Sequence, residues 1–168
     1  MDKIELVFPA KHHETAASEY LKEHIAFGEN TLHGDSFLDS AASFDCWLKD
    51  INEALTGEIP SIIFFAIRKF DDRLLGTINI RHPYKGYVQV HGHIGYGIRP
   101  SERGKGYATT MLQLALDYCK TIGLEKILLT CDKSNVASAK TIQKCLGIFE
   151  SEIQKENGDT SQRYWINI

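Results

Sequence analysis

The sequence predicts an α+β fold in which a mixed β-sheet of about seven strands is flanked by about four helices. Seven short segments are apolar or alternate between apolar and polar residues, as strands do, and four longer segments repeat apolar residues at helical spacing. These segments follow one another in the order β-α-α-β-β-β-α-β-α-β-β. With 168 residues, of which 43% are hydrophobic, the chain suits one domain spanning residues 1–168.

The first third of the chain predicts one strand, two helices and a long loop. Residues 3–8 alternate and are expected to form a strand, and residues 11–24 form a helix with an acidic outer face. A second helix is expected over 44–55, with Ser43 as its N-cap. The polar, irregular segment between the helices, residues 28–43, is long enough to carry function.

The middle of the chain predicts a hairpin and a glycine-marked strand. The strands 61–68 and 74–81 are joined by a turn, and residues 84–90 lead to a further strand over 91–98. Three glycines punctuate that strand, which suggests a bulge or the close approach of another chain or a ligand: Gly92, Gly95 and Gly97.

The remaining third predicts a crossover followed by a closing hairpin. The clearest helix covers 106–122, and the short apolar strand 126–131 follows it, so that strand, helix and strand form a βαβ unit with parallel strands. The last elements are a helix over 136–144 and two strands joined by a turn at 156–159, over 147–153 and 162–168.

Composition excludes several classes of protein. No apolar run approaches the roughly 18 residues that span a membrane, and the first residues lack a secretory signal, so we expect a cytoplasmic protein. The four cysteines are widely spaced and form no C-x-x-C pair, which favours free buried thiols over disulfides or a metal site. No dense Lys/Arg stripe interleaved with aromatic residues points to nucleic acid.

Charge is divided unevenly along the chain. Residues 1–58 hold 4 Lys/Arg and 12 Asp/Glu, a balance of −8, while residues 59–168 hold 15 and 10, a balance of +5, and together these give the net −3. Such a division could attract a cation to one part and an anion to the other, or it could be two solvated faces without a partner.

The loop at residues 103–106 narrows the set of possible functions of this protein more than any other segment. Arg103 and Lys105 place positive charge, and Gly104 and Gly106 place open backbone, directly before a predicted helix. Amide N–H groups at a helix N-terminus are suited to a pyrophosphate. A Rossmann loop would need a strand near the N-terminus and a third glycine, and a Walker loop would need Ser or Thr after Lys105, so both are disfavoured.

In this context the sequence resembles the GNAT superfamily of N-acetyltransferases, and within it a bacterial subgroup of predicted acetyltransferases. The 103–108 segment matches the family's Q/R-x-x-G-x-G/A loop, and Asn135 with the helix after it resembles the family's second cofactor segment. The resemblance covers residues 61–168 well and the whole chain more loosely. The cofactor-binding residues that it implies are Ile98, Arg99, Arg103, Gly104, Lys105, Gly106, Tyr107, Ala108, Asn135 and Ser138.

The resemblance implies a centrally splayed sheet and an acetyl-CoA-dependent N-acyltransferase. Residues 61–168 would form the acetyl-CoA-binding core, and residues 1–58 would supply the substrate-side helices and loop. The acceptor would be a primary amine of a small molecule or peptide, attacked directly in a ternary complex, and a homodimer would be unsurprising. Two alternatives are a non-catalytic CoA-binding or sensory module and an unrelated phosphate-binding protein.

Two histidines are candidates for the general base. His91 and His93 lie two residues apart on the predicted strand, so their side chains would share a face. A pair at this spacing resembles that of arylalkylamine acetyltransferases, and the pKa of histidine suits proton transfer near neutral pH. Structural histidines packed under the sheet are the alternative interpretation.

The general acid is left open by one departure from the family pattern. Many members have a Tyr seven residues after the Asn, where this chain has Ile142. Tyr164 is our first candidate in its place, with Tyr96, Tyr107 and a water molecule as alternatives. Cys131 and Cys145 could carry the acyl group in a ping-pong route, but we favour the interpretation that both are buried thiols of the core.

The acidic N-terminal third favours a cationic amine as the acceptor. Asp35, Asp39 and Asp45 are the candidates for binding it, and a plain solvated acidic surface is an equal alternative.

Overall fold

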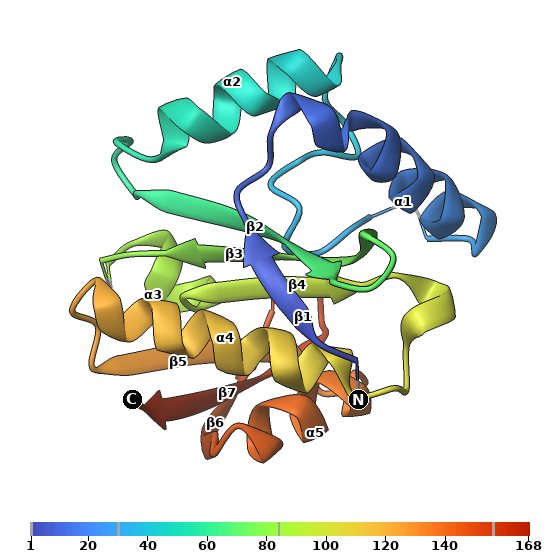
Figure 1. Ribbon diagram of the computed structural model, residues 1–168. Helices are drawn as coiled ribbons and strands as arrows, with labels where there is room; N and C mark the ends of the chain where they lie inside the picture. Colours follow the sequence, from blue (N-terminus) through green and yellow to red (C-terminus); the bar gives the residue numbers. More distant parts are fainter. Residues whose placement is uncertain (1, 30, 84, 156) are drawn as a thin grey trace.

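The computed structural model describes residues 2–29, 31–83, 85–155 and 157–168, and it confirms the α+β class (Figure 1). One sheet has the order β1-β2-β3-β4 and a second has the order β5-β7-β6, and every ladder within them is antiparallel. The strands are β1 Ile4–Val7, β2 Ser61–Arg68, β3 Arg73–Arg81, β4 Ile94–Ile98, β5 Lys126–Asp132, β6 Ile148–Gln154 and β7 Thr160–Asn167.

The described helices number five, one more than expected. They are α1 Glu14–Ala26, α2 Phe44–Ala54, α3 Tyr87–His91, α4 Tyr107–Thr121 and α5 Val136–Lys144, with short 3₁₀ turns at Lys11–His13 and Pro100–Glu102. Ser43 is confirmed as the N-cap of α2, because its Oγ accepts the Cys46 N–H at 3.1 Å.

The strand predicted over 91–98 is wrong at its start. His91 ends the five-residue helix α3, and β4 begins only at Ile94. Gly86 and Gly92 flank α3 with φ values of +50° and +79°, which an extended strand does not contain, and Val88 anchors the turn with none of its surface exposed. His91 and His93 therefore do not share the face of one strand.

The seven strands are divided at the centre of the fold into these two antiparallel sheets, and among the described residues no parallel ladder joins β4 to β5, where the βαβ unit predicted one. β4 and β5 belong to different sheets, and at the start of β4 the His93 N–H donates to the Leu128 carbonyl at 2.8 Å. Gly92 allows this approach, since a Cβ there would lie 2.8 Å from the Leu128 oxygen. The expected splay is thus present, and it leaves room between β4 and β5 for a ligand.

Two cores pack on the faces of the four-stranded sheet. Tyr20, Trp47 and Phe65 lie in one core, between the sheet and helices α1 and α2. Met111 and Leu129 lie in the other, which joins α4 to both sheets. Figure 1 shows the same layers, with α1 and α2 above β2 and with α4 and α5 below it.

The loop between α1 and α2 lies directly on β4. A Cβ on Gly97 would stand 2.7 Å from the His33 oxygen, and one on Gly34 would stand 2.6 Å from the Gly95 oxygen. The glycines of this strand therefore mark a close approach, but the approaching segment is a loop of the same chain, where the sequence suggested another chain or a ligand.

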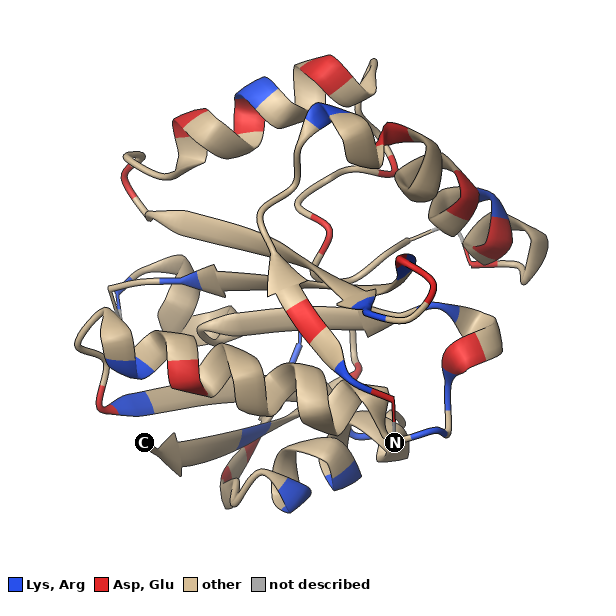
Figure 2. Cartoon of the chain, in the orientation of Figure 1, with Lys and Arg blue, Asp and Glu red and all other residues tan. Residues whose placement is uncertain are grey.

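The acidic residues of the first third gather in space as well as in sequence. Figure 2 shows most of the red segments of the upper layer on α1 and α2. None of the helices among the described residues is both long and apolar enough to span a membrane.

Candidate active site

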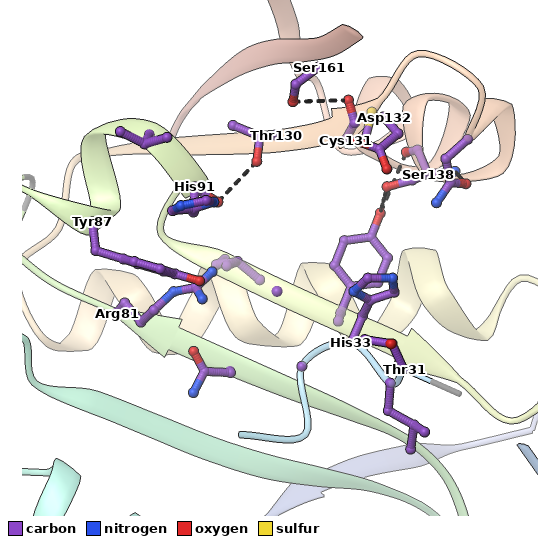
Figure 3. A pocket seen from close by; sticks show the side chains of 18 of the residues that line it. Thr31, His33, Arg81, Tyr87, His91, Thr130, Cys131, Asp132, Ser138 and Ser161 are labelled. Atoms are coloured by element: carbon purple, nitrogen blue, oxygen red, sulfur yellow. Dashed lines mark hydrogen bonds between the residues drawn. The ribbon is translucent and has the colours of Figure 1, made fainter. Parts of the chain in front are cut away.

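A cavity of about 990 Å³ opens where β4 and β5 separate. The loop 31–39 forms one wall, and residues from the ends of β2 and β3, from α3 and from β4 form another. The opposite wall comes from β5, the start of α5 and the β6–β7 hairpin. Figure 3 shows labelled side chains around this space from the 31–39 loop, β3, α3, β5, α5 and β7.

One end of the cavity is built around the start of α5. Asn135 caps this helix, because its Oδ1 accepts the Ser138 N–H at 3.0 Å. The Ser138 hydroxyl lies 2.9 Å from the Tyr96 hydroxyl across the gap. Burial raises the pKa of Tyr96 to about 12, so this phenol keeps its proton at neutral pH.

The other end holds Arg81, Tyr87 and His91, which Figure 3 shows grouped together. The Arg81 guanidinium lies 5.2 Å from the centre of the Tyr87 ring, and the His91 ring stacks on the same tyrosine at 4.1 Å. Burial, followed by the charges of Arg81 and Lys155, lowers the pKa of His91. His91 is therefore neutral at physiological pH and able to accept a proton.

The 103–108 loop lies outside this cavity, beyond the end of β4. Gly104 and Gly106 adopt φ values of +74° and +86°, and Gly106 is the N-cap of α4. The five amides of residues 104–108 donate no hydrogen bond to any residue that the structure describes. This row of amides at the start of a 15-residue helix is a suitable site for an anion.

The two cations of the loop are already paired. Arg103 binds Glu29 through both terminal nitrogens, at 2.5 and 2.8 Å, and its Nε donates to the Ile98 carbonyl at 2.9 Å. Lys105 lies 3.0 Å from the buried carboxylate of Glu102. The backbone amides, rather than these side chains, are therefore the part of the loop that is ready for an anion.

Three further predicted cofactor residues support the loop from beneath. The Arg99 side chain is buried, donates to the Leu74 carbonyl at 3.1 Å and pairs with Glu23 at 2.7 Å. The Tyr107 hydroxyl donates to Asp2 at 2.7 Å. Ala108 packs against the larger core.

His93 joins the start of β4 to β5. Its ring is 1% exposed, and its Nδ1 accepts the Leu128 N–H at 2.9 Å. Because an accepting nitrogen carries no proton, the neutral ring holds its proton on Nε2. Burial lowers the pKa of this histidine, and the ring does not line the cavity. The geometry gives His93 a positioning role, and a catalytic role for it stays a prediction.

Tyr164 and Ile142 lie in the core. The Tyr164 hydroxyl donates to Gln162 at 2.8 Å, and its ring packs edge-on against Phe149. Ile142 is fully buried on α5. Of the three tyrosines considered as the acid, Tyr96 is the one that lines the cavity.

A sequence model described as an acetyltransferase (GNAT) domain matches residues 10–146. The chain belongs to the GNAT family. The uncharacterized N-acetyltransferase YnaD of Bacillus subtilis is 30% identical over 107 residues, which are 61% of this chain and 61% of that protein. The match thus spans about three fifths of the length of this curated relative.

Solved members of the GNAT family share the fold. An acetyl transferase of Salmonella typhimurium, described as modifying the N-terminal serine of a 50S ribosomal protein, has a TM-score of 0.75 and 13% identity, covering 98% of this chain and 95% of its own. The microcin C7 self-immunity acetyltransferase MccE, in complex with acetyl-CoA and AMP, has a TM-score of 0.74 and 18% identity, covering 100% of this chain and 94% of its own. The spermidine/spermine N-acetyltransferase SpeG of Vibrio cholerae has a TM-score of 0.70 and 19% identity, covering 98% of this chain and 93% of its own.

The aspartates expected to bind a cationic acceptor are engaged elsewhere. Asp45 pairs with Lys11 at 2.8 Å on the outer surface. The carboxylates of Asp35 and Asp39 line the cavity, but each accepts a backbone N–H of the 31–39 loop at 3.2 Å. They shape the loop as Asx turns do.

Sequence reasoning missed two cavity residues on β3, Asn79 and Arg81. The sequence indicates Arg81 only as the end of a strand, and the polar Asn79 inside the apolar run 74–80 is the signal that points to this site. Asn79 is 5% exposed, and its Nδ2 donates to the Ser36 and Ser61 hydroxyls at 2.6 Å each. Among the described residues, no group of three or more His, Cys, Asp or Glu could hold a metal ion.

Proposed function

We propose that this protein transfers an acetyl group from acetyl-CoA to a primary amine by direct attack in a ternary complex. The observation that carries the proposal is the row of unengaged amides at residues 104–108, placed beyond the end of a strand that borders a large cavity. The amides would hold the pyrophosphate, and the gap between β4 and β5 would take the extended arm through edge-strand hydrogen bonds. Acetyl-CoA supplies an activated thioester carbonyl to this site.

Direct attack is favoured over an acyl-cysteine route by the state of the thiols. Cys131 lines the cavity, but burial raises its pKa, and burial also raises the pKa of Cys145. The Cys145 sulfur lies 3.7 Å from the Thr109 carbonyl, within the core. A protonated thiol is a weak nucleophile, which favours attack of the amine nitrogen directly on the thioester carbonyl, so that the C–N bond forms as the C–S bond to CoA breaks.

His91 is the histidine that the geometry favours as general base. It lines the cavity and its lowered pKa keeps it neutral, whereas the His93 Nδ1 is occupied by the Leu128 amide. We expect kcat/KM of the wild type to fall on the acid side, with a midpoint below ~6.5, the usual histidine pKa. In His91→Ala this acid limb should be lost, and a retained limb in both His91→Ala and His93→Ala would exclude a histidine base.

Tyr96, with Ser138 beside it, is the group that would protonate the leaving thiolate. Its pKa of about 12 keeps the proton available, and Tyr96→Phe should lower kcat by roughly 100-fold, with little change in KM. Tyr164→Phe serves as the control, because that hydroxyl is bonded to Gln162 in the core. An unchanged kcat in Tyr96→Phe, with a drop in Tyr164→Phe, would return the role to Tyr164.

The test of the function is thermal unfolding with acetyl-CoA, followed by thiol release on a panel of amines. A ligand that binds only the native state must raise Tm, and the double variant Arg103→Glu/Gly106→Val should remove that rise. The absence of a shift at saturating acetyl-CoA or CoA would overturn the proposal. A shift without thiol release on any amine would favour the alternative of a non-catalytic CoA-binding module, which Ile142 in the usual Tyr position supports.

A further inference from the structure

We propose that Arg81 binds a carboxylate of the acceptor, so that the amine acetylated here carries an anionic group near its nitrogen. The inference rests on the proposed function, because it names the substrate class for the same cavity. It is the opposite of the cationic acceptor that the charge balance of residues 1–58 favours.

Arg81 differs from the other basic side chains that line the cavity. Lys155 pairs with Asp132, and Arg163 pairs with Glu150 at 2.5 Å. Among the residues that the structure describes, Arg81 forms no ion pair with a carboxylate, and only burial and Tyr87 shift its pKa. Its buried Nε has no hydrogen-bond partner among them. A guanidinium offers a planar fork of donors that matches a carboxylate.

The surroundings of Arg81 hold the side chain in place without neutralising it. Tyr87 lies under the guanidinium at 5.2 Å from the ring centre. Burial lowers the pKa of Arg81, and the Tyr87 phenol opposes this shift, whereas no acidic residue among those described contributes. A partly buried cation without a counter-ion is unfavourable, and an anionic ligand would remove that penalty.

Asn79 provides a second polar group beside Arg81. The two residues are separated by one position on β3, so their side chains emerge on the same face of the strand. The Asn79 Nδ2 is used by the Ser36 and Ser61 hydroxyls, and its buried Oδ1 has no partner among the described residues. The polar surroundings of Arg81 on β3 are therefore incompletely satisfied within the described residues.

The acidic residues of the cavity do not cancel this charge. The Asp35 and Asp39 carboxylates accept backbone N–H groups of their own loop, and Asp132 is taken by Lys155. Burial raises the pKa of Asp35, and the backbone N–H groups that it accepts oppose this shift. Arg81 and His91 lie together at the end of the cavity away from Ser138, as Figure 3 shows.

The first experiment compares matched acceptors in a thiol-release assay. Free L-amino acids are tested against the corresponding amino acid amides, which keep the amine and lose the carboxylate, and spermidine serves as a cationic acceptor. We expect KM for the free acids to be about 10- to 100-fold lower than for the amides, the effect of hydrogen bonds to a charged group. Equal KM values, or a preference for the amides or spermidine, would overturn the inference.

Variants at Arg81 test whether this side chain causes the difference in KM between free amino acids and their amides. Arg81→Met should make the acid and the amide equivalent, and Arg81→Glu should reverse the preference toward the amide and spermidine. Lys49→Met is the control, because it removes the same charge from a side chain on α2 that is 75% exposed. Discrimination that survives in Arg81→Met would overturn the role of this residue.

A binding measurement separates failure of the inference from failure of the proposed function. The acid and the amide are titrated calorimetrically into protein saturated with CoA, and the CoA-induced rise in Tm confirms that each variant is folded. Should no amine release thiol, the catalytic function fails, yet tighter binding of the acid that is lost in Arg81→Met still supports the inference. Equal binding of acid and amide to the wild type overturns it independently of turnover.

Discussion

The 103–108 loop and the Arg81 end of the cavity differ in whether their cationic side chains are paired with a carboxylate. Arg103 is held by Glu29 and by the Ile98 carbonyl, so its charge is balanced before any ligand arrives. Arg81 has a neighbouring aromatic ring and no counter-ion among the described residues. The loop thus offers neutral, preorganised backbone donors, while the cavity offers a side-chain charge.

This difference follows from what each region has to recognise. A pyrophosphate is the same in every acetyl-CoA molecule, and backbone amides fixed by a helix N-terminus and two glycines can bind it without much side-chain chemistry. An acceptor amine differs from one enzyme to another, so its selection depends on side chains such as Arg81 and Asn79. Selectivity arises where a buried polar group is left unpaired by the wrong substrate.

The largest expected effect breaks the loop while leaving the cavity intact. Gly104 and Gly123 have φ values of +74° and +79°, and a Cβ at either would meet open space. Valine at either position should strain the backbone by about 1–2 kcal/mol, so both variants should lose a similar amount of Tm. Only Gly104→Val should also weaken CoA binding by more than about 100-fold, because it disturbs several amide–phosphate hydrogen bonds.

Calorimetric titration of CoA into both variants measures this contrast. Gly123→Val is the matched control, since Gly123 follows the far end of α4. Similar CoA affinities in the two variants would show that the amides of the loop are not the phosphate site.

A smaller effect on stability should distinguish the two arginines. Arg103→Met loses three hydrogen bonds and should lower the free energy of unfolding by about 1 kcal/mol, or Tm by roughly 2–4 °C. Arg81→Met removes a cation without a counter-ion and should leave Tm unchanged or raise it. Thermal scans without ligand test the pair, and a larger loss in Arg81→Met would mean that Arg81 is a structural residue.

Glu29→Gln should have a still smaller effect, on the CoA affinity of the loop and on the stability of the fold at low pH. Glu29 competes with phosphate for Arg103, so its removal should tighten CoA binding about threefold at low salt. The Arg103 hydrogen bonds lower the pKa of Glu29 to about 2. Because that pKa lies below its unfolded value of ~4.5, the pair stabilises the fold above pH 4.5, and this contribution is lost as the pH falls toward 2.

Acid titration of unfolding free energy checks the second part of this prediction. Glu29→Gln should show a shallower loss of stability between about pH 4.5 and 2 than the wild type. Glu53→Gln is the control, because Glu53 lies 3.7 Å from Lys49 in an exposed pair on α2. Unchanged CoA affinity in Glu29→Gln would mean that phosphate does not recruit Arg103.

The cofactor side could be predicted from sequence because its features are local. Strand 61–68 and helix 136–144 have the predicted bounds, and the glycine loop stands directly before its helix. Each depends on residues that are neighbours along the chain, such as Asn135 capping the helix that contains Ser138.

The acceptor side could not be predicted in the same way, because tertiary packing determines it. A helix of five residues is too short to have a period of its own, and α3 exists because Val88 is buried between two glycines with positive φ. In the sequence, Arg81 is indicated only as the end of an apolar strand. Its lack of a counter-ion among the described residues depends on segments that are distant in the sequence and meet only in the folded structure.

The smallest expected effect tests whether the cavity thiol takes part in transfer. Cys131→Ser replaces a thiol whose pKa is raised by burial, and direct attack by the amine predicts kcat within about twofold of the wild type. Cys119→Ser is the control for polar substitution in the core, since Cys119 is fully buried on α4 away from the cavity. Rapid-quench analysis for a covalent acetyl-enzyme accompanies the kinetics. A drop of 100-fold or more in Cys131→Ser, together with acetylated wild-type protein, would replace the ternary complex with a ping-pong route and would place the acyl carrier on β5.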